Sequence, residues 1–186
     1  MDTEYDDTKI QGSIDLFKKW HRTGFVSVAY WATAEKVIVE IGAIDPDKNN
    51  ALLKATKCFI PSLQFMSYLH AEIHGMTDRM FPSFDTKGVS FFGGTPKPPV
   101  VSRIFNSSYY LDYRNNKQID PLYRTFTCAH YDGEVTGKGV ITPIFKNEIS
   151  KNTMKIALVD LAEMYHLLYM QAIAELTVHT MQELKK

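Results

Sequence analysis

The residues best suited to chemistry include a small number of histidines and carboxylates at short spacing. His70 and His74 are four residues apart in a stretch with helical periodicity, a spacing that can hold zinc, but no third ligand lies nearby in the sequence. His130, Asp132 and Glu134 gather at an Asp-Gly turn, where paired carboxylates could do acid–base work. The simpler interpretation is a hairpin turn, because Asp-Gly is a common hairpin signature.

Cys58 and Cys128 lie in apolar, strand-like stretches. A nucleophilic cysteine needs a positioned histidine, and His130 stands beside Cys128 on the same strand face instead of opposite it. We therefore interpret both cysteines as reduced core thiols, which places the protein inside the cell, in the cytoplasm. We expect no enzymatic activity, no metal and no cofactor.

The glycine-rich stretch 133–139 has neither the spacing nor the Lys-Ser/Thr ending of a phosphate-binding loop. A β-turn explains it, although Lys138 within it could contact a phosphate.

Aromatic and basic side chains alternate through the middle of the chain. Exposed rings can stack on bases while Lys and Arg follow the phosphates, which is how sheet proteins hold single strands, at about 1–3 kcal/mol per stacked base. The competing interpretation is that alternate rings pack into a sheet core. The residues expected to bind nucleic acid are Tyr30, Trp31, Lys54, Lys57, Arg103, Phe105, Tyr109, Tyr110, Tyr113, Arg114, Lys117, Tyr123, Arg124 and Lys138.

Composition and charge narrow the class of protein. The chain has 186 residues, of which 45% are apolar and 23% charged, the balance of a globular protein with no membrane-spanning run. The formal net charge is zero, yet residues 87–155 carry ten Lys and Arg against five Asp and Glu. A local basic segment between acidic flanks is compatible with moderate, salt-sensitive binding.

The elements that must position these residues follow from periodicity and turn signals. We expect a disordered acidic tail at 1–9 and a single α+β domain at 10–186, with sub-units 10–75 and 101–184. Residues 10–23 fit either a short helix or an edge strand. Residues 76–100, rich in Gly and Pro, are expected to form a long connecting loop that acts as a mobile flap. The expected strands are 25–31, 37–41, 52–60, 101–113, 123–131, 140–145 and 153–158, and the expected helices are 62–74, capped by Ser62, and 159–183.

This order gives two antiparallel β-meanders, each followed by a helix, with a long C-terminal helix. The plan resembles the Whirly and positive-cofactor-four class of single-stranded-nucleic-acid-binding proteins. The resemblance covers about residues 10–184 and rests on element order, since the Lys-Gly-Lys-Ala-Ala-Leu stretch of Whirly proteins has no counterpart beyond Gly137-Lys138-Gly139-Val140. It implies single-strand binding by a homo-oligomer whose helices, the C-terminal one included, pack against a neighbouring subunit. An OB-type barrel is disfavoured by the long C-terminal helix.

The leading hypothesis is therefore a non-enzymatic protein that binds single-stranded DNA or RNA, as a homo-oligomer and without membrane contact. The alternative is a protein-interaction or assembly factor that uses the same aromatic surface, because Tyr, Phe and Arg are also enriched in protein interfaces.

Overall fold

The computed structural model describes residues 10–82, 88–116 and 118–183, with side chains up to Val178. The expected acidic tail at 1–9 and the candidate Lys117 lie outside the described residues. Two four-stranded antiparallel sheets follow one another along the chain, each completed by a helix. The expected α+β class, with its paired meanders and long C-terminal helix, is confirmed.

Sheet A has the strand order β1-β2-β3-β4, and every strand pairs with its neighbour in sequence. Its strands are β1 (Ser13–His21), β2 (Gly24–Trp31), β3 (Lys36–Asp45) and β4 (Ala51–Pro61). Residues 13–21, which fit either a helix or a strand by sequence, form an edge strand with a bulge between Asp15 and Phe17. Two helices follow, α1 (Ser62–Ile73) and the one-turn α2 (Thr77–Met80).

Sheet B repeats the meander with the order β5-β6-β7-β8. Its strands are β5 (Val89–Thr95), β6 (Val101–Asp112), β7 (Gln118–Val135) and β8 (Ile141–Ala157), and the helix α4 (Leu158–Glu183) completes the chain. The β3–β4 and β6–β7 turns share one chemistry. Asp45 and Asp112 each accept from a backbone N–H two residues on, and Asn49 and Asn116 each take the left-handed conformation, which Asn tolerates.

Three expectations about local structure were wrong. The supposed loop 76–100 contains α2 and the edge strand β5. Its glycines mark close backbone contact instead of a hinge, since a Cβ at Gly94 would clash with the Val101 carbonyl oxygen. The strands expected at 140–145 and 153–158 are one strand, β8, whose edge position tolerates Pro143. Ser62 makes no capping hydrogen bond, because Pro61 occupies the cap position.

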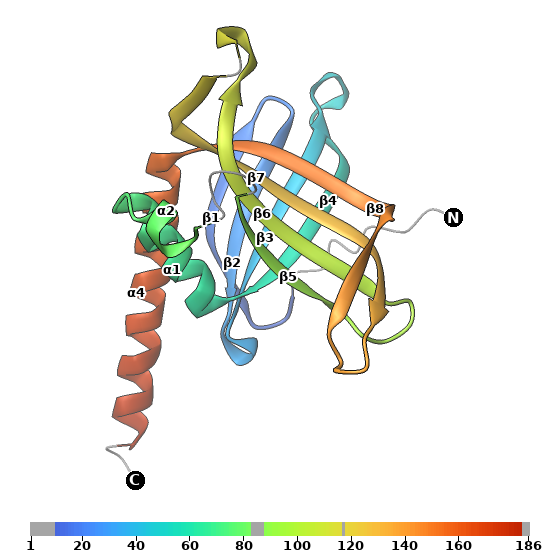
Figure 1. Cartoon of the computed structure of the whole chain (residues 1–186). Helices are drawn as coiled ribbons and strands as arrows, with labels where there is room; N and C mark the ends of the chain where they lie inside the picture. Colours follow the sequence, from blue (N-terminus) through green and yellow to red (C-terminus); the bar gives the residue numbers. More distant parts are fainter. Residues whose placement is uncertain (1–9, 83–87, 117, 184–186) are drawn as a thin grey trace.

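The main core lies between the two sheets and under the helices. Figure 1 shows sheet B in front of sheet A, with α1 and α4 along one side of both sheets. Phe65 of α1 meets Phe105 of β6 edge-on at 5.7 Å, and Tyr68 hydrogen-bonds Ser107. The first half of α4 adds Leu161, Met164 and Leu168 to this core. The helices therefore seal one end of the two-sheet sandwich.

Polar contacts join the sheets away from the helices. The Asn152 side-chain amide of β8 donates to the Ile41 carbonyl of β3 at 3.1 Å, and the Thr56 hydroxyl of β4 donates to Ser150 at 3.1 Å. On the helical side, Lys19 of β1 pairs with Asp160 at the start of α4 at 2.6 Å. These contacts fix which face of sheet A turns inward and leave its other face outside.

Candidate nucleic-acid interface

Two of the predicted binding residues are part of the core. The Phe105 ring is 0% exposed, and Tyr30 is 9% exposed with its hydroxyl donating to Glu175 of α4 at 2.9 Å. Burial, reinforced by Glu175, raises the pKa of Tyr30 to about 12. Neither ring can stack on a base, so the competing interpretation of core packing holds at these two positions.

Arg124 is also a structural residue in this fold. Its guanidinium lies 2.8 Å from the Glu72 carboxylate of α1, and the two side chains are 8% and 0% exposed. It also donates to the Pro121 and Tyr123 carbonyls and lies over the Tyr109 ring. This buried ion pair ties α1 to sheet B and is not available to a phosphate.

The far end of the β6–β7 hairpin gathers several other predicted residues. Lys155 lies 3.9 Å and 3.5 Å above the rings of Tyr110 and Tyr123, while Tyr113 and Arg114 are exposed at the tip. Acidic groups lie among them. Lys155 is 3.7 Å from Asp120, and the Tyr109 hydroxyl donates to Asp78. This surface, the hairpin patch, is aromatic but locally compensated in charge.

Lys54 and Lys138 lie apart from these groups. The Lys54 ammonium donates to the Ile149 carbonyl at 3.1 Å, beside β8. Lys138 is exposed in the β7–β8 turn.

Trp31 and Lys57 lie on the outer face of sheet A, the face that points away from sheet B, and Arg103 of β6 reaches the Phe59 ring of this face. Strand alternation explains this placement, because Val26, Val28 and Tyr30 of β2 point into the core. The intervening side chains of β2 point outward, and they are Phe25, Ser27, Ala29 and Trp31. The outer face carries both tryptophans of the chain.

One end of the outer face holds an aromatic group made by β1 and β2. Trp20 is 57% exposed, and its ring packs against Phe25 with centroids 5.0 Å apart. The Lys18 ammonium lies 4.5 Å from the Trp20 ring centroid and 4.7 Å from that of Phe25. A cation at this distance from a ring is attracted by its π-electrons, so an exposed ring and a positive charge are held together.

The other end holds a second aromatic group. Trp31 meets Phe59 of β4 edge-on at 6.3 Å, and the Arg103 guanidinium lies 5.5 Å from the Phe59 centroid. Arg103 reaches this group from β6 and donates to Thr95 at 2.6 Å. Burial lowers the pKa of Arg103, because desolvation disfavours its charged form, yet an arginine keeps its proton at neutral pH. Phe25 and Trp31 are six residues apart on β2, so the two groups are separated by about 20 Å.

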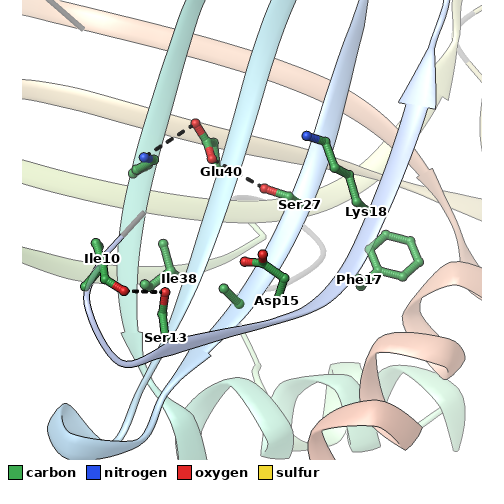
Figure 2. A pocket seen from close by; sticks show the side chains of 10 residues that line it. Ile10, Ser13, Asp15, Phe17, Lys18, Ser27, Ile38 and Glu40 are labelled. Carbon is green, nitrogen blue, oxygen red and sulfur yellow. Dashed lines mark hydrogen bonds and ion pairs between the residues drawn. The ribbon is translucent and has the colours of Figure 1, made fainter. Parts of the chain in front are cut away.

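A hollow of about 220 Å³ lies between the two aromatic groups. Figure 2 shows Lys18, Ser27, Glu40 and Asp15 around it, with Ile10 and Ser13 at its rim. Glu40 of β3 lies opposite Lys57 of β4, with 3.9 Å between carboxylate and ammonium, and it accepts from the Ser27 hydroxyl at 3.4 Å. Burial raises the pKa of Glu40, although the Lys57 charge acts against the shift.

Sequence reasoning missed Lys18, Trp20 and Phe59 as members of this surface. Lys18 and Trp20 fell in the segment that fits either a helix or a strand, so no face could be assigned to them. Phe59 had a detectable signal, since it lies two residues after Lys57 in an expected strand and therefore on the same face.

The candidate catalytic and metal-binding groups do not assemble. The His130 Nε2–H donates to the Lys57 carbonyl at 2.6 Å between the sheets, whereas Asp132 accepts from Asn147. The His70 and His74 rings lie 4.3 Å apart on α1. Within residues 10–82, 88–116 and 118–183, no three His, Cys, Asp or Glu side chains are grouped as metal ligands.

Both cysteines are buried free thiols, as expected. Cys128 of β7 contacts the Val39 carbonyl across the sheet interface at 3.6 Å. A hydrogen bond with Cys128 lowers the pKa of Cys58, and burial raises the pKa of Cys128.

No described helix is long and apolar enough to cross a membrane. No protein-family model matches the chain, and neither a curated protein nor a solved structure matches it.

Proposed function

We propose that the protein binds single-stranded DNA or RNA across the outer face of sheet A. One observation carries the proposal: Trp20 and Trp31, the only tryptophans of the chain, lie on one exposed sheet face, each in an aromatic group with a cation. Rings of this kind accept any base, and the adjacent cations neutralise phosphates. The paired strands of sheet A hold the rings of both groups, and Arg103 reaches the second group from sheet B.

The binding energy expected of this surface is moderate. Each stacked base contributes about 1–3 kcal/mol. Three cations on or beside this face can contact phosphates, namely Lys18, Arg103 and Lys36, which pairs with Trp31 across β2 and β3. They predict a slope of log K against log salt of about −2 for a single strand. Binding should therefore weaken by roughly 15-fold between 50 and 200 mM salt.

The test uses a labelled oligo-dT of about 30 nucleotides in anisotropy titrations, with quenching of the intrinsic tryptophan fluorescence as a second signal. Trp20→Ala should weaken binding by roughly 5- to 100-fold, because it removes one stacking ring. Tyr113→Ala is the matched control, since it removes an exposed ring from the hairpin patch and should leave the affinity unchanged. Absence of binding at low salt, or a larger loss for Tyr113→Ala than for Trp20→Ala, contradicts the proposal.

A protein-interaction function is the second candidate, and the hairpin patch favours it. Apolar side chains are exposed along this hairpin, namely Leu111, Tyr113, Ile119 and Leu122. Binding of a protein partner there would depend far less on salt than phosphate contacts do. The two candidate surfaces are made by different sheets, so the variants above separate them.

Self-association through α4 and an intracellular site of action both fit the proposed function. Two buried free thiols are typical of a protein kept in a reducing compartment.

A further inference from the structure

The hollow on the outer face of sheet A lies where a strand stacked on both aromatic groups would pass. A role for this hollow rests on the proposed function, because it concerns the nucleotide between the two stacking groups. The volume of about 220 Å³ equals that of about seven liquid waters. It is below the ~300 Å³ where drug-sized pockets begin, and it suits one nucleobase.

The hollow has an apolar floor and one polar side. Ala29 and Ile38, paired across β2 and β3, form an apolar floor on which a flat ring can lie. Ser27, Glu40 and Lys57 stand beside that floor on three consecutive strands. A base lying on the floor would direct its hydrogen-bonding edge at these polar groups.

Glu40 and Lys57 place hydrogen-bond acceptors, the carboxylate oxygens, next to a hydrogen-bond donor, the ammonium. An ionised carboxylate only accepts hydrogen bonds, with about four lone-pair positions, and an ammonium only donates. Two accepting oxygens beside one donor are complementary to the Watson–Crick edge of guanine, which offers the N1–H and N2–H donors beside the O6 acceptor. Adenine and cytosine each offer one amino group on that edge, and thymine offers one imino N–H.

The position of Glu40 is also unfavourable for an ionised side chain as far as the stability of the folded protein is concerned. Burial disfavours the ionised carboxylate, and Lys57 at 3.9 Å compensates only in part. Partly desolvated carboxylates of this kind concentrate at functional sites.

We propose that this hollow selects a guanine base, with the Glu40 carboxylate accepting from N1–H and N2–H and the Lys57 ammonium donating to O6. Lys18 stands at the same hollow, where it can neutralise the adjacent phosphate. The outer face then combines sequence-tolerant stacking at its two ends with one selective position between them.

The experiment compares twelve-nucleotide oligo-dT strands in which one central residue is dT, dG, dA or deoxyinosine, the last lacking only the N2 amino group. The dG strand should bind about tenfold more tightly than the other three, the size expected for a good bidentate base contact. Glu40→Gln should reduce this preference to less than twofold while binding of plain oligo-dT persists. Glu134→Gln, an exposed carboxylate on β7, is the matched control and should keep the preference.

The outcomes separate the two proposals. Equal binding of all four strands overturns the guanine site and leaves the proposed function standing, whereas no binding of any strand overturns the function itself. GMP is tested as a competitor, and competition as strong as that of the dG strand would assign the hollow to a free nucleotide. Lys57→Met is a second variant, and retention of a full dG preference by both variants contradicts the assignment.

Discussion

The carboxylate of Glu40 is the clearest case in which a single residue opposes stability. Burial raises its pKa, so its ionised form is less stable in the folded protein than in the unfolded chain. The shift makes the free energy of unfolding depend on pH. The stability that the protonated carboxyl contributes is fully present below the ordinary pKa of about 4.5, and it is lost as the pH rises through the pKa of the folded protein. A glutamine is isosteric and never ionises.

We therefore expect Glu40→Gln to match the wild type in free energy of unfolding near pH 4 and to exceed it at pH 7. Urea denaturation at the two pH values measures the difference. A variant that is less stable than the wild type at pH 7 would show that the Lys57 interaction outweighs desolvation. The same data establish that the binding variant is folded.

In contrast to the charge of Glu40, the charge of Arg124 stabilises the folded protein, because it neutralises the fully buried carboxylate of Glu72. Arg124→Met leaves the Glu72 carboxylate without its cation inside the protein, which should cost about 3–5 kcal/mol of stability. Arg114→Met, at an exposed turn position, should change stability by less than about 0.5 kcal/mol. Chemical denaturation measures both, and equal effects would refute a structural role for the buried pair.

At this scale, sequence analysis could predict residue types but not which side of a strand faces the core. Arg103, Phe105 and Tyr109 share one face of β6 by alternation, and that face is the inner face of sheet B. Only the packing of the second sheet decides the question, and no local pattern reports it. Of the residues predicted to bind nucleic acid, Trp31 and Lys57 lie on the outer face of sheet A, and Arg103 reaches the Phe59 ring of that face from β6.

Among the elements, strands with uninterrupted β-branched or aromatic alternation could be predicted, and those containing Gly or Pro could not. Gly93 and Gly94 indicated a connecting loop, yet both lie in β5, and Gly94 allows close backbone contact with Val101 at the sheet edge. Pro143 indicated an edge strand or a bulge, and β8 is an edge strand, where some N–H groups need no partner in the sheet. Proline therefore identified the edge strand β8, whereas glycine hid the edge strand β5.

The second half of helix α4 extends beyond the sheets and carries exposed apolar side chains. It has 26 residues against 12 in α1, and Figure 1 shows it continuing past the sheets. Tyr169, Ile173 and Leu176, at helical spacing, are exposed on its far half. A twofold arrangement of two copies would bury the same stripe from both sides.

Ile173→Glu should therefore lower the molar mass in solution to that of one chain, 21.3 kDa. Light scattering coupled to size exclusion gives the mass. Ser67→Glu, on the exposed side of α1, is a control for added charge. If the wild type is itself a monomer at micromolar concentration, self-association through α4 is wrong.

At the scale of the whole molecule, the distribution of charged residues along the sequence differs from their distribution over the surface. The basic segment 87–155 builds sheet B, and of its cations only Arg103 reaches the aromatic groups of sheet A within the described part of the chain. Lys18 and Lys57 come from the acidic first part of the chain. A segment-wise charge count therefore points to sheet B, whereas the proposed binding surface lies on sheet A.

The neighbour-to-neighbour order of the strands also sets the order in which the protein can form during synthesis. Sheet A can pair completely once Pro61 has left the ribosome, but its inner face stays uncovered until sheet B follows. At the usual elongation rate that interval is on the order of 10 s. During it, the row of Val26, Val28, Val37 and Val39 is an apolar surface on the nascent chain, so timely emergence of the second meander protects the first from aggregation.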